Sequence, residues 1–356
     1  MRLNQLTAEE RRIALDAAQL YEQFLDVREE RQAYRGGLHW KKVGGKDYLV
    51  KTLDRHGTQQ SLGARSRASE QTYRNFTQRK RDLSSRLKAL QEELRRQARF
   101  CVAGSVNRVP RLAADIVRLL DTNGLLGTPL IVVGSHALYA YEMAAGVQLR
   151  AGLLQTVDLD ALLEAGRVLN LGGPIRRLGL IGILCKVDKT FKMAAHRSFR
   201  AVNARGFAVE LIGAHSETAT GPFSIGLGRD LIAELLPGLQ WLSVPPTMSQ
   251  IVIGENGYPV RFVVPDPRVF ALHKLWLSLQ PTRSPLKRKR DFRQGEAVAQ
   301  LALDYLNLSF DDAALKALPA ELTSMVPGLV DRLRSRTAGG SKRFKLPIGF
   351  EEDRDI

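Results

Sequence analysis

The sequence is poor in cysteine and histidine and has no long apolar run, and each shortage excludes a class of protein. Two cysteines among 356 residues allow neither a disulfide framework nor a cysteine-based zinc site. The six histidines show no His-x-x-x-His or similar metal-binding spacing. No run approaches the roughly 18 apolar residues of a membrane span, and residues 1–10 are too polar and acidic for a secretory signal. We therefore expect a cytoplasmic protein with no membrane partner.

Basic residues, in contrast, are abundant and unevenly distributed. The chain has 53 Lys and Arg against 37 Asp and Glu, a net charge of +16. The excess is concentrated in residues 31–100 and in a second basic cluster, residues 283–293, with Lys287-Arg288-Lys289-Arg290 at its centre. Polyanions are attracted to such surfaces through counterion release. The pattern favours nucleic acid, RNA above all, or a nucleoside triphosphate at the second cluster; the alternative is a solvated surface that aids solubility.

Length and composition allow two or three domains with a sizeable core, since 44% of the 356 residues are hydrophobic and 25% are charged. We expect four segments along the chain. They are a basic N-terminal helical region (residues 1–108), a mixed α/β core (109–265), a helical C-terminal region (266–337) and a loosely ordered tail (338–356).

A β-hairpin is predicted near residues 38–53 of the N-terminal region. Gly44-Gly45 separates two alternating runs, which is typical of a two-residue hairpin turn. Aromatic rings between lysines could stack on bases while the lysines hold phosphates. An equally good interpretation is that the tryptophan packs on a neighbouring helix. The candidate nucleic-acid-binding residues are Trp40, Lys41, Lys42, Lys46 and Lys51.

Two long helices are predicted beside this hairpin. Thr7-Ala8-Glu9-Glu10 is a capping box that begins a helix running to about Ala33. Residues 69–100 form the longest helical pattern, with apolar residues at spacings of three, four and seven. This seam favours packing within the chain over a surface for a partner protein. Its members are Tyr73, Phe76, Leu83, Leu87, Leu90 and Leu94.

Helices and strands alternate in the α/β core, which predicts a sheet with helices on at least one face. The expected strands are residues 130–133, 157–159, 182–186 and 208–212, followed by a hairpin over residues 251–264. Beyond the break at Pro265-Asp266-Pro267, helices are expected over residues 269–279, 295–306 and 310–334.

Acidic side chains in this core are the main indication of chemistry. Asp158 and Asp160 are one residue apart on an expected strand, so both point to the same face. Glu210 is the single acid in the apolar run of residues 207–212. Two like charges beside apolar neighbours are costly unless a divalent metal binds their oxygens. The alternative is a pair of solvated acids at a strand end.

A Gly134-Ser135 turn lies between an expected strand and an expected helix, an arrangement that suits phosphate binding. Glycine allows close approach of the backbone, and free N–H groups at a helix start attract anions. The serine hydroxyl adds a donor. His136, which follows, is better interpreted as a packing or capping residue than as a catalyst.

The order of these motifs resembles the polymerase-β-like nucleotidyltransferase fold: strand, Gly-Ser turn and helix, then Asp-Leu-Asp on a strand, then Glu on another strand. Further stretches are similar to those of a bacterial family of nucleotidyltransferase-fold proteins, and the likeness covers about residues 30–310. One departure is a longer interval than usual between Gly-Ser and Asp-x-Asp, which an extra helical turn and a loop would fill. The similar stretches are residues 34–45, 61–66, 130–142, 156–160, 265–268, His273-Lys274, and 289–291 with Gln294.

The resemblance implies an α+β fold, with a mixed sheet and flanking helices, and a Mg²⁺- or Mn²⁺-dependent transfer of NMP from an NTP to a hydroxyl group. Asp158 and Asp160 would bridge two metal ions, and Glu210 would complete one site or act as a base. Gly134 and Ser135 would hold phosphates. Two further residues are assigned less directly. Lys274 is either a cation for the leaving pyrophosphate or surface charge, and Asp291 either positions the cations or forms an inconsequential salt bridge.

The acceptor does not follow from the resemblance. The basic N-terminal third favours RNA, with tRNA as the first expectation, whereas an antibiotic acceptor would need no such surface. Two other functions remain open. One is a non-catalytic nucleic-acid-binding or regulatory protein on the same fold. The other is a toxin component that acts on a protein or RNA target and is neutralised by an antitoxin partner.

Overall fold

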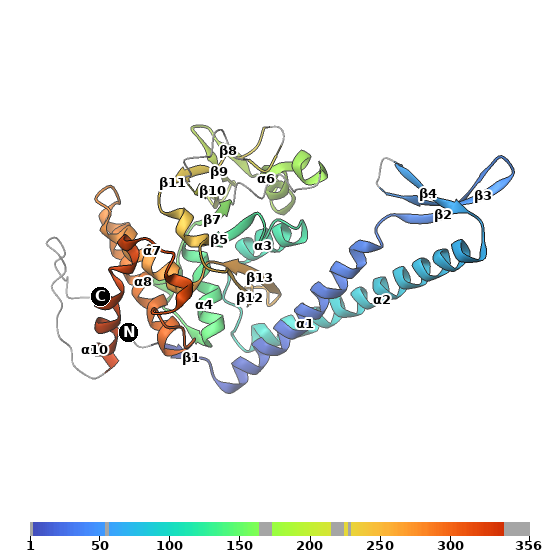
Figure 1. The fold of residues 1–356 in the computed structure, drawn as a ribbon. Helices are drawn as coiled ribbons and strands as arrows, with labels where there is room; N and C mark the ends of the chain where they lie inside the picture. The colour runs from blue at the N-terminus through green and yellow to red at the C-terminus, as the bar shows by residue number, and fades with distance from the viewer. Residues whose placement is uncertain (1–2, 54–56, 164–172, 215–223, 227–228, 338–356) are drawn as a thin grey trace. The chain divides into compact units, whose positions relative to one another are not determined.

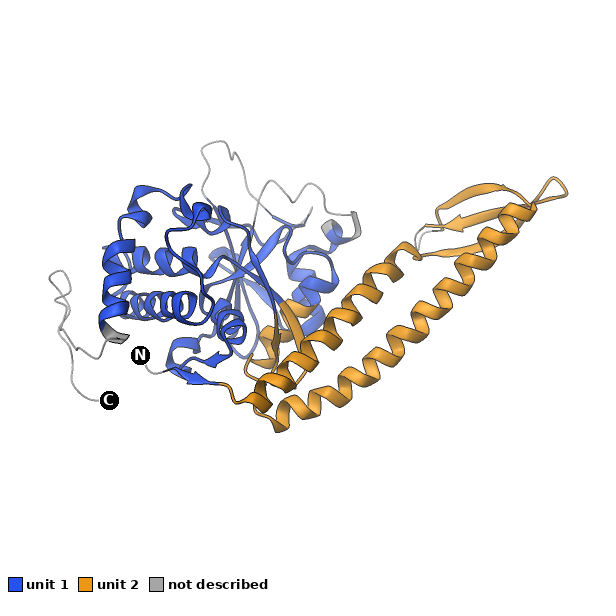
Figure 2. Ribbon diagram, turned by 60° about the horizontal axis from the view of Figure 1, so that its bottom comes forward, with its two compact units in different colours: residues 1–5, 119–250, 262–356 blue, residues 6–118, 251–261 orange. Residues whose placement is uncertain are grey.

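The computed structural model describes residues 3–53, 57–163, 173–214, 224–226 and 229–337 (Figure 1). The expected tail, residues 338–356, lies outside the described residues. Contacts between Cα atoms divide the chain into two compact units, coloured separately in Figure 2. Unit 1 comprises residues 1–5, 119–250 and 262–356, and unit 2 comprises residues 6–118 and 251–261.

Unit 1 is built on a six-stranded mixed sheet. The strand order is β5-β7-β10-β9-β8, and β11 pairs with β10. Strand β7 runs parallel to β10 and antiparallel to β5, while β9 is antiparallel to β10. The predicted α+β class, a mixed sheet with flanking helices, is thus confirmed. The strands are β5 (Leu130–Val133), β7 (Asp158–Leu163), β8 (Lys192–Ala194), β9 (Arg197–Val202), β10 (Ala208–Ala214) and β11 (Glu234–Leu236).

Helices accompany this sheet, and two of them form the most extensive helix pair of unit 1. α7 begins at an Asp266 cap, whose carboxylate accepts from the Arg268 N–H at 2.8 Å, and Pro267 occupies its first turn. α7 packs along α8, and α8 also contacts α4. The helices are α4 (Ala137–Ala145), α5 (Ala151–Leu154), α6 (Gly173–Val187), α7 (Pro267–Leu279), α8 (Pro285–Asp304), α9 (Ala320–Thr323) and α10 (Val326–Thr337).

Short pairings complete the element order. β1 (Asn4–Gln5) pairs with β6 (Val147–Gln148), and β12 (Met248–Ile253) forms the predicted hairpin with β13 (Pro259–Val264). β6 and α5 lie within the long interval between Gly-Ser and Asp-x-Asp, after a 3₁₀ turn at Gly134–His136. The extra residues therefore form ordered structure.

Unit 2 is a helical hairpin that carries a small sheet. α1 (Ala8–Ala33) begins with the predicted capping box, in which Thr7 and Glu10 exchange hydrogen bonds of 2.7 and 3.2 Å. α1 packs on α2 (Arg67–Ala103), so the apolar seam of α2 is intramolecular: Leu83 and Leu90 cluster with Val27, and Leu94 with Tyr21. The sheet consists of β2 (Gly37–Val43), β3 (Lys46–Thr52) and β4 (Gln59–Ala64), and α3 (Arg111–Thr122) follows α2.

Some predicted elements were wrong. Residues 182–186 were expected as a strand but belong to helix α6, which has a break at Gly179. A short apolar run does not distinguish a buried helix from a buried strand. The helix expected over residues 310–334 is divided into a 3₁₀ turn, α9 and α10, and α8 begins ten residues earlier than expected. Among the described residues, no helix combines the length and apolarity that a membrane crossing requires.

Candidate active site

Strand register brings the three predicted acids together. In the parallel pairing of β7 with β10, Asp160 lies opposite Glu210, and Asp158 lies opposite Ala208. Asp158 and Asp160 share one face of β7, as the sequence predicted. One carboxylate oxygen from each of the three acids lies within 4.8 Å of the others. Three half-buried carboxylates at this spacing form a donor set that suits a hard divalent cation.

The backbone of Gly134 lies so close to the Asp160 carboxylate that no side chain would fit at this position. Val133, the last residue of β5, pairs with Asp160, and the chain turns at Gly134 with φ of +64°. A Cβ on Gly134 would lie 1.9 Å from Asp160 Oδ2. The sequence predicted a glycine for close backbone approach, and the group it approaches here is the Asp160 carboxylate. Glycine is therefore required both for the backbone conformation and for the space.

The electrostatic environment of Asp160 opposes its ionisation. Burial raises the pKa of Asp160 from 3.8 to about 7, and the neighbouring Asp158 and Glu210 carboxylates act in the same direction. Lys274 and Lys287 oppose this shift of the Asp160 pKa. A cation held between the acids would remove the repulsion and would stabilise the cluster.

Two polar side chains hold the outer acids. The Thr156 hydroxyl donates to Asp158 Oδ1, which fixes that carboxylate at the start of β7. Arg200, on the neighbouring strand β9, pairs with Glu210 in the register and forms an ion pair with its carboxylate. Sequence reasoning identified neither partner. Arg200 is placed beside Glu210 by the pairing of β9 with β10, whereas Thr156 lies only two residues before Asp158 in the chain.

A buried ion-pair network lies on the helical side of the site. Lys274, in the middle of α7, contacts Asp291 Oδ1 through Nζ at 2.8 Å. Arg283 Nε contacts the other oxygen of Asp291, also at 2.8 Å. Burial acts to raise the pKa of Asp291, yet the two cations hold it below its ordinary value. Burial lowers the pKa of Lys274 against the opposing effect of Asp291. Asp291 thus contacts two cations, and its role in positioning them for a nucleotide stays a prediction.

The Ser135 hydroxyl is also fixed by a buried partner. Gln294 Nε2, on α8, donates to Ser135 Oγ at 3.0 Å and to the Leu153 carbonyl at 2.7 Å. Because Ser135 accepts this hydrogen bond, its own hydroxyl hydrogen remains available for another acceptor. Gln294 was noticed in the sequence only as part of a similar stretch, without a role.

These residues surround one cavity of about 150 Å³. Its acidic side is formed by the three carboxylates, and its basic side by four cations from α7, α8 and the segment between them. Arg283, Lys287 and Arg290 belong to the second basic cluster of the sequence. The polar and glycine residues that line the cavity are Gly134, Ser135, Asp158, Asp160, Glu210, Glu234, His273, Lys274, Arg283, Lys287 and Arg290.

The two histidines near the cavity are buried and neutral. Burial lowers the pKa of His136 to about 4 and that of His273 to about 3. His136 packs between Tyr139 and Phe207, with ring centroids 6.0 and 6.3 Å away, which supports the packing interpretation. His273 stacks on Trp276 at 5.8 Å. Neither histidine is therefore expected to be a cation at neutral pH.

The predicted nucleic-acid residues of the hairpin lie in unit 2, and its tryptophan is engaged by neighbours. Trp40 packs against Tyr73 of α2, with ring centroids 5.9 Å apart. The guanidinium carbon of Arg65 lies 5.1 Å from the centre of the Trp40 ring. Lys51 Nζ lies 5.9 Å from the centre of the Phe76 ring. The geometry therefore favours the helix-packing interpretation of Trp40. Three predicted cations, Lys41, Lys42 and Lys46, remain exposed.

Comparison with known proteins adds one finding. Residues 111–319, more than half of the chain, match the model of a family described as nucleotidyltransferase. This span contains every residue of the candidate active site. No curated protein and no solved structure matches the chain.

Proposed function

The chain belongs to this nucleotidyltransferase family and is a transferase enzyme, and on that premise we propose that it moves NMP from an NTP to a hydroxyl group of RNA, with tRNA as the first expected acceptor. The observation that carries the proposal is the cluster of Asp158, Asp160 and Glu210, whose oxygens lie within 4.8 Å of one another. A cluster of this kind, beside a cavity lined with cations, supports phosphoryl chemistry.

The three acids are the proposed holders of Mg²⁺ or Mn²⁺. The donor set fits, because it consists of carboxylate oxygens only and because Asp160 is difficult to ionise without an added positive charge. A bound divalent metal supplies stabilisation of negative charge on the attacking and leaving oxygens. Thr156 and Arg200 keep the outer carboxylates of Asp158 and Glu210 in place.

The cations and Ser135 are proposed to hold the triphosphate. Ser135, positioned by Gln294, directs its hydroxyl hydrogen to a phosphate oxygen. Lys274 and Arg283, held by Asp291, neutralise the negative charge that grows on the leaving pyrophosphate. The cavity of about 150 Å³ is smaller than the roughly 300–1,000 Å³ of a typical ligand pocket. Only the phosphates of an NTP are therefore expected to be enclosed.

The proposed reaction is an in-line displacement at the α-phosphorus. The acceptor oxygen forms a bond to phosphorus, the bond to the β-phosphate oxygen breaks, and pyrophosphate leaves. The hydroxyl proton passes to Glu210 or to solvent. RNA is favoured as acceptor because the chain has a net charge of +16, and most of this positive excess lies outside residues 111–319, the part that matches the family. An antibiotic acceptor would leave that charge without a function.

The test is a transfer assay with the full chain. Each α-³²P-labelled NTP is incubated with total tRNA and Mg²⁺, and products are separated on denaturing gels. Label is expected on RNA with the intact protein and on no product with Asp160→Asn, while the exposed-site control Asp311→Asn retains activity. Label on a protein or small molecule would overturn the RNA acceptor. Absence of transfer with any NTP in Mg²⁺ and in Mn²⁺ would overturn the proposed reaction.

A further inference from the structure

The outward face of α2 carries a regular row of positive charge. The apolar seam fixes the inward face of α2: its leucines pack on α1, and Tyr73 packs on Trp40 of β2. One residue after Tyr73 and at every seventh position along the helix stands a basic side chain. Seven residues rise about 10.5 Å along a helix, so the five cations span roughly 42 Å. This row, called the α2 basic row, consists of Arg67, Arg74, Arg81, Lys88 and Arg95.

All five side chains of the α2 basic row are exposed, and most of its charge is uncompensated. Arg74 meets Glu70 at 3.4 Å, and Arg95 pairs with Glu92. These are solvent-exposed ion pairs within one helix, which are worth little and are easily exchanged for another anion. Among the residues that the structure describes, Arg67, Arg81 and Lys88 form no ion pair.

The two helices of the hairpin differ in sign. α2 contains ten Lys and Arg against four Asp and Glu, whereas α1 contains four against seven. Attraction between the helices does not account for the α2 basic row, because the row lies outside the seam and its five side chains are exposed. A surface that served solubility alone would not need one helix to collect the positive charge and the other the negative charge.

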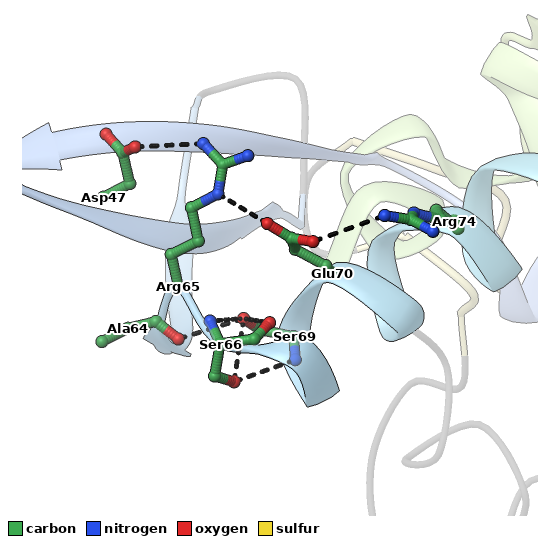
Figure 3. A network of polar contacts seen from close by, with 7 residues as sticks. All are labelled: Asp47, Ala64, Arg65, Ser66, Ser69, Glu70 and Arg74. Carbon is green, nitrogen blue, oxygen red and sulfur yellow. Dashed lines mark hydrogen bonds and ion pairs between the residues drawn. The ribbon is translucent and has the colours of Figure 1, made fainter.

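The N-terminal end of the row is joined to the sheet by hydrogen bonds and ion pairs (Figure 3). Ser66 and Ser69 form a reciprocal capping box, with the Ser69 N–H 3.2 Å from Ser66 Oγ. Arg65 contacts Asp47 of β3 at 3.3 Å and Glu70 of α2 at 2.9 Å, which ties the helix to the sheet. The charge of Arg65 is thereby neutralised. Asp47, Arg65 and Glu70 line a shallow hollow at the surface, and Lys46 and Arg67 line it as well. Among the described residues, neither Lys46 nor Arg67 forms an ion pair.

We propose that the α2 basic row, continued by Lys46, is a docking surface for the phosphodiester backbone of double-helical RNA. A row of cations at regular intervals is complementary to a rigid, uniformly charged polyanion. A membrane surface is disfavoured, because the leucines of the α2 seam are buried against α1 and the exposed apolar residues of α2, Phe100 and Val102, lie beyond the C-terminal end of the row. The proposal deepens the proposed RNA acceptor, on which the choice of RNA rests, but binding along α2 does not require the chemistry at Asp160.

The experiment compares two triple variants of the full chain with equal loss of charge. Arg67→Gln, Arg81→Gln and Lys88→Gln are combined in the row variant. Three exposed lysines of unit 1, Lys189, Lys192 and Lys316, are changed to Gln in the control. Fluorescence anisotropy measures the Kd for an RNA duplex of about 20 base pairs, which is longer than the row. Circular dichroism shows that both variants remain folded.

We expect the row variant to bind the duplex at least tenfold more weakly than the intact protein, and the control to bind within about threefold. The slope of log Kd against log salt, between about 0.1 and 0.4 M KCl, should fall by roughly two to three for the row variant and by less than one for the control. The slope counts the phosphate contacts that are lost, so it separates a docking surface from a general effect of net charge.

Equal weakening in the row variant and the control would overturn the proposal, as would an unchanged salt slope in the row variant. Tighter binding to phosphatidylserine vesicles than to RNA, or tenfold preference for a DNA duplex, would assign the row to another partner and overturn the RNA occupant. Asp160→Asn should bind the duplex as the intact protein does. Binding that persists without any nucleotidyl transfer would therefore refute the proposed function alone.

Discussion

The Asp160→Asn substitution separates the stability of the protein from its activity. Asp160 lies between two other carboxylates, and its surroundings raise its pKa from 3.8 to about 7. An amide has nearly the same shape but carries no charge, so it relieves the repulsion in the metal-free protein. The same change removes a carboxylate from the candidate metal site. We therefore expect Asp160→Asn to be more stable than the intact protein and inactive.

The size of the gain follows from linkage. A raised pKa of an acid costs no stability below the ordinary pKa of 3.8, where the carboxyl is protonated in the folded and the unfolded chain. The cost grows as the pH rises from there and is complete above about 7. At about 1.4 kcal/mol for each unit of pKa, the cost at pH 8 is at most roughly 4 kcal/mol, and about 2 kcal/mol after allowance for relaxation and partial exposure.

Thermal denaturation of metal-free protein measures this effect. At pH 8 the Tm of Asp160→Asn should exceed that of the intact protein by several degrees, and at pH 4.5 by about one degree or less. Added Mg²⁺ should raise the Tm of the intact protein and leave that of Asp160→Asn unchanged. Asp311→Asn, at an exposed position, should shift the Tm little at either pH.

Two outcomes would refute this reasoning. A gain in Tm that is the same at pH 4.5 and pH 8 would mean that charge repulsion is not its cause. A Mg²⁺-dependent rise in Tm that survives the substitution would mean that the cation is held without Asp160, and the carboxylate cluster would then not be the metal site.

Three further substitutions test other parts of the site. Gly134→Ala should cost about 1–3 kcal/mol and abolish transfer, because its Cβ would lie 1.9 Å from Asp160 Oδ2 at a φ of +64°; an unchanged Tm with full activity would contradict this. Asp291→Asn should lower stability by about 3 kcal/mol, since Lys274 loses its buried counter-charge; a Tm within one degree of the intact protein would exclude a structural role. Ser135→Ala should raise the KM for NTP about 5- to 30-fold, equivalent to about 1–2 kcal/mol, with little change in Tm; an unchanged KM would remove Ser135 from the triphosphate site.

Much of the core could be read from local sequence patterns. The spacing of Asp158 and Asp160 fixes their common face wherever the segment is a strand, and the capping box at Thr7 fixes the start of α1. Such features depend on residues close together in the chain. The apolar seam of α2 likewise determines its inward face, because a helix repeats every 3.6 residues. Only the identity of the partner helix had to come from the structure.

Other features depend on register and on tertiary packing, which local patterns do not determine. That Asp160 faces Glu210, and Arg200 faces Glu210 from the opposite strand, follows from pairings between segments up to fifty residues apart. The apolar run at residues 182–186 has the composition of a strand and forms part of α6. Trp40 had two equally good interpretations from sequence, and the neighbouring Tyr73 and Arg65 favour packing.

The directions in which the pKa values of two aspartates are shifted support the different roles proposed for them. Asp160 and Asp291 belong to the same compact unit, and burial acts to raise the pKa of each. For Asp160 the nearby carboxylates add to that effect, whereas for Asp291 Lys274 and Arg283 reverse it. The charge of Asp291 is therefore compensated by two cations, whereas the ionised form of Asp160 would be stabilised by an added positive charge. A carboxylate whose ionisation burial and its neighbours both disfavour is retained at a cost in stability, and the proposed binding of a divalent ion would offset this cost.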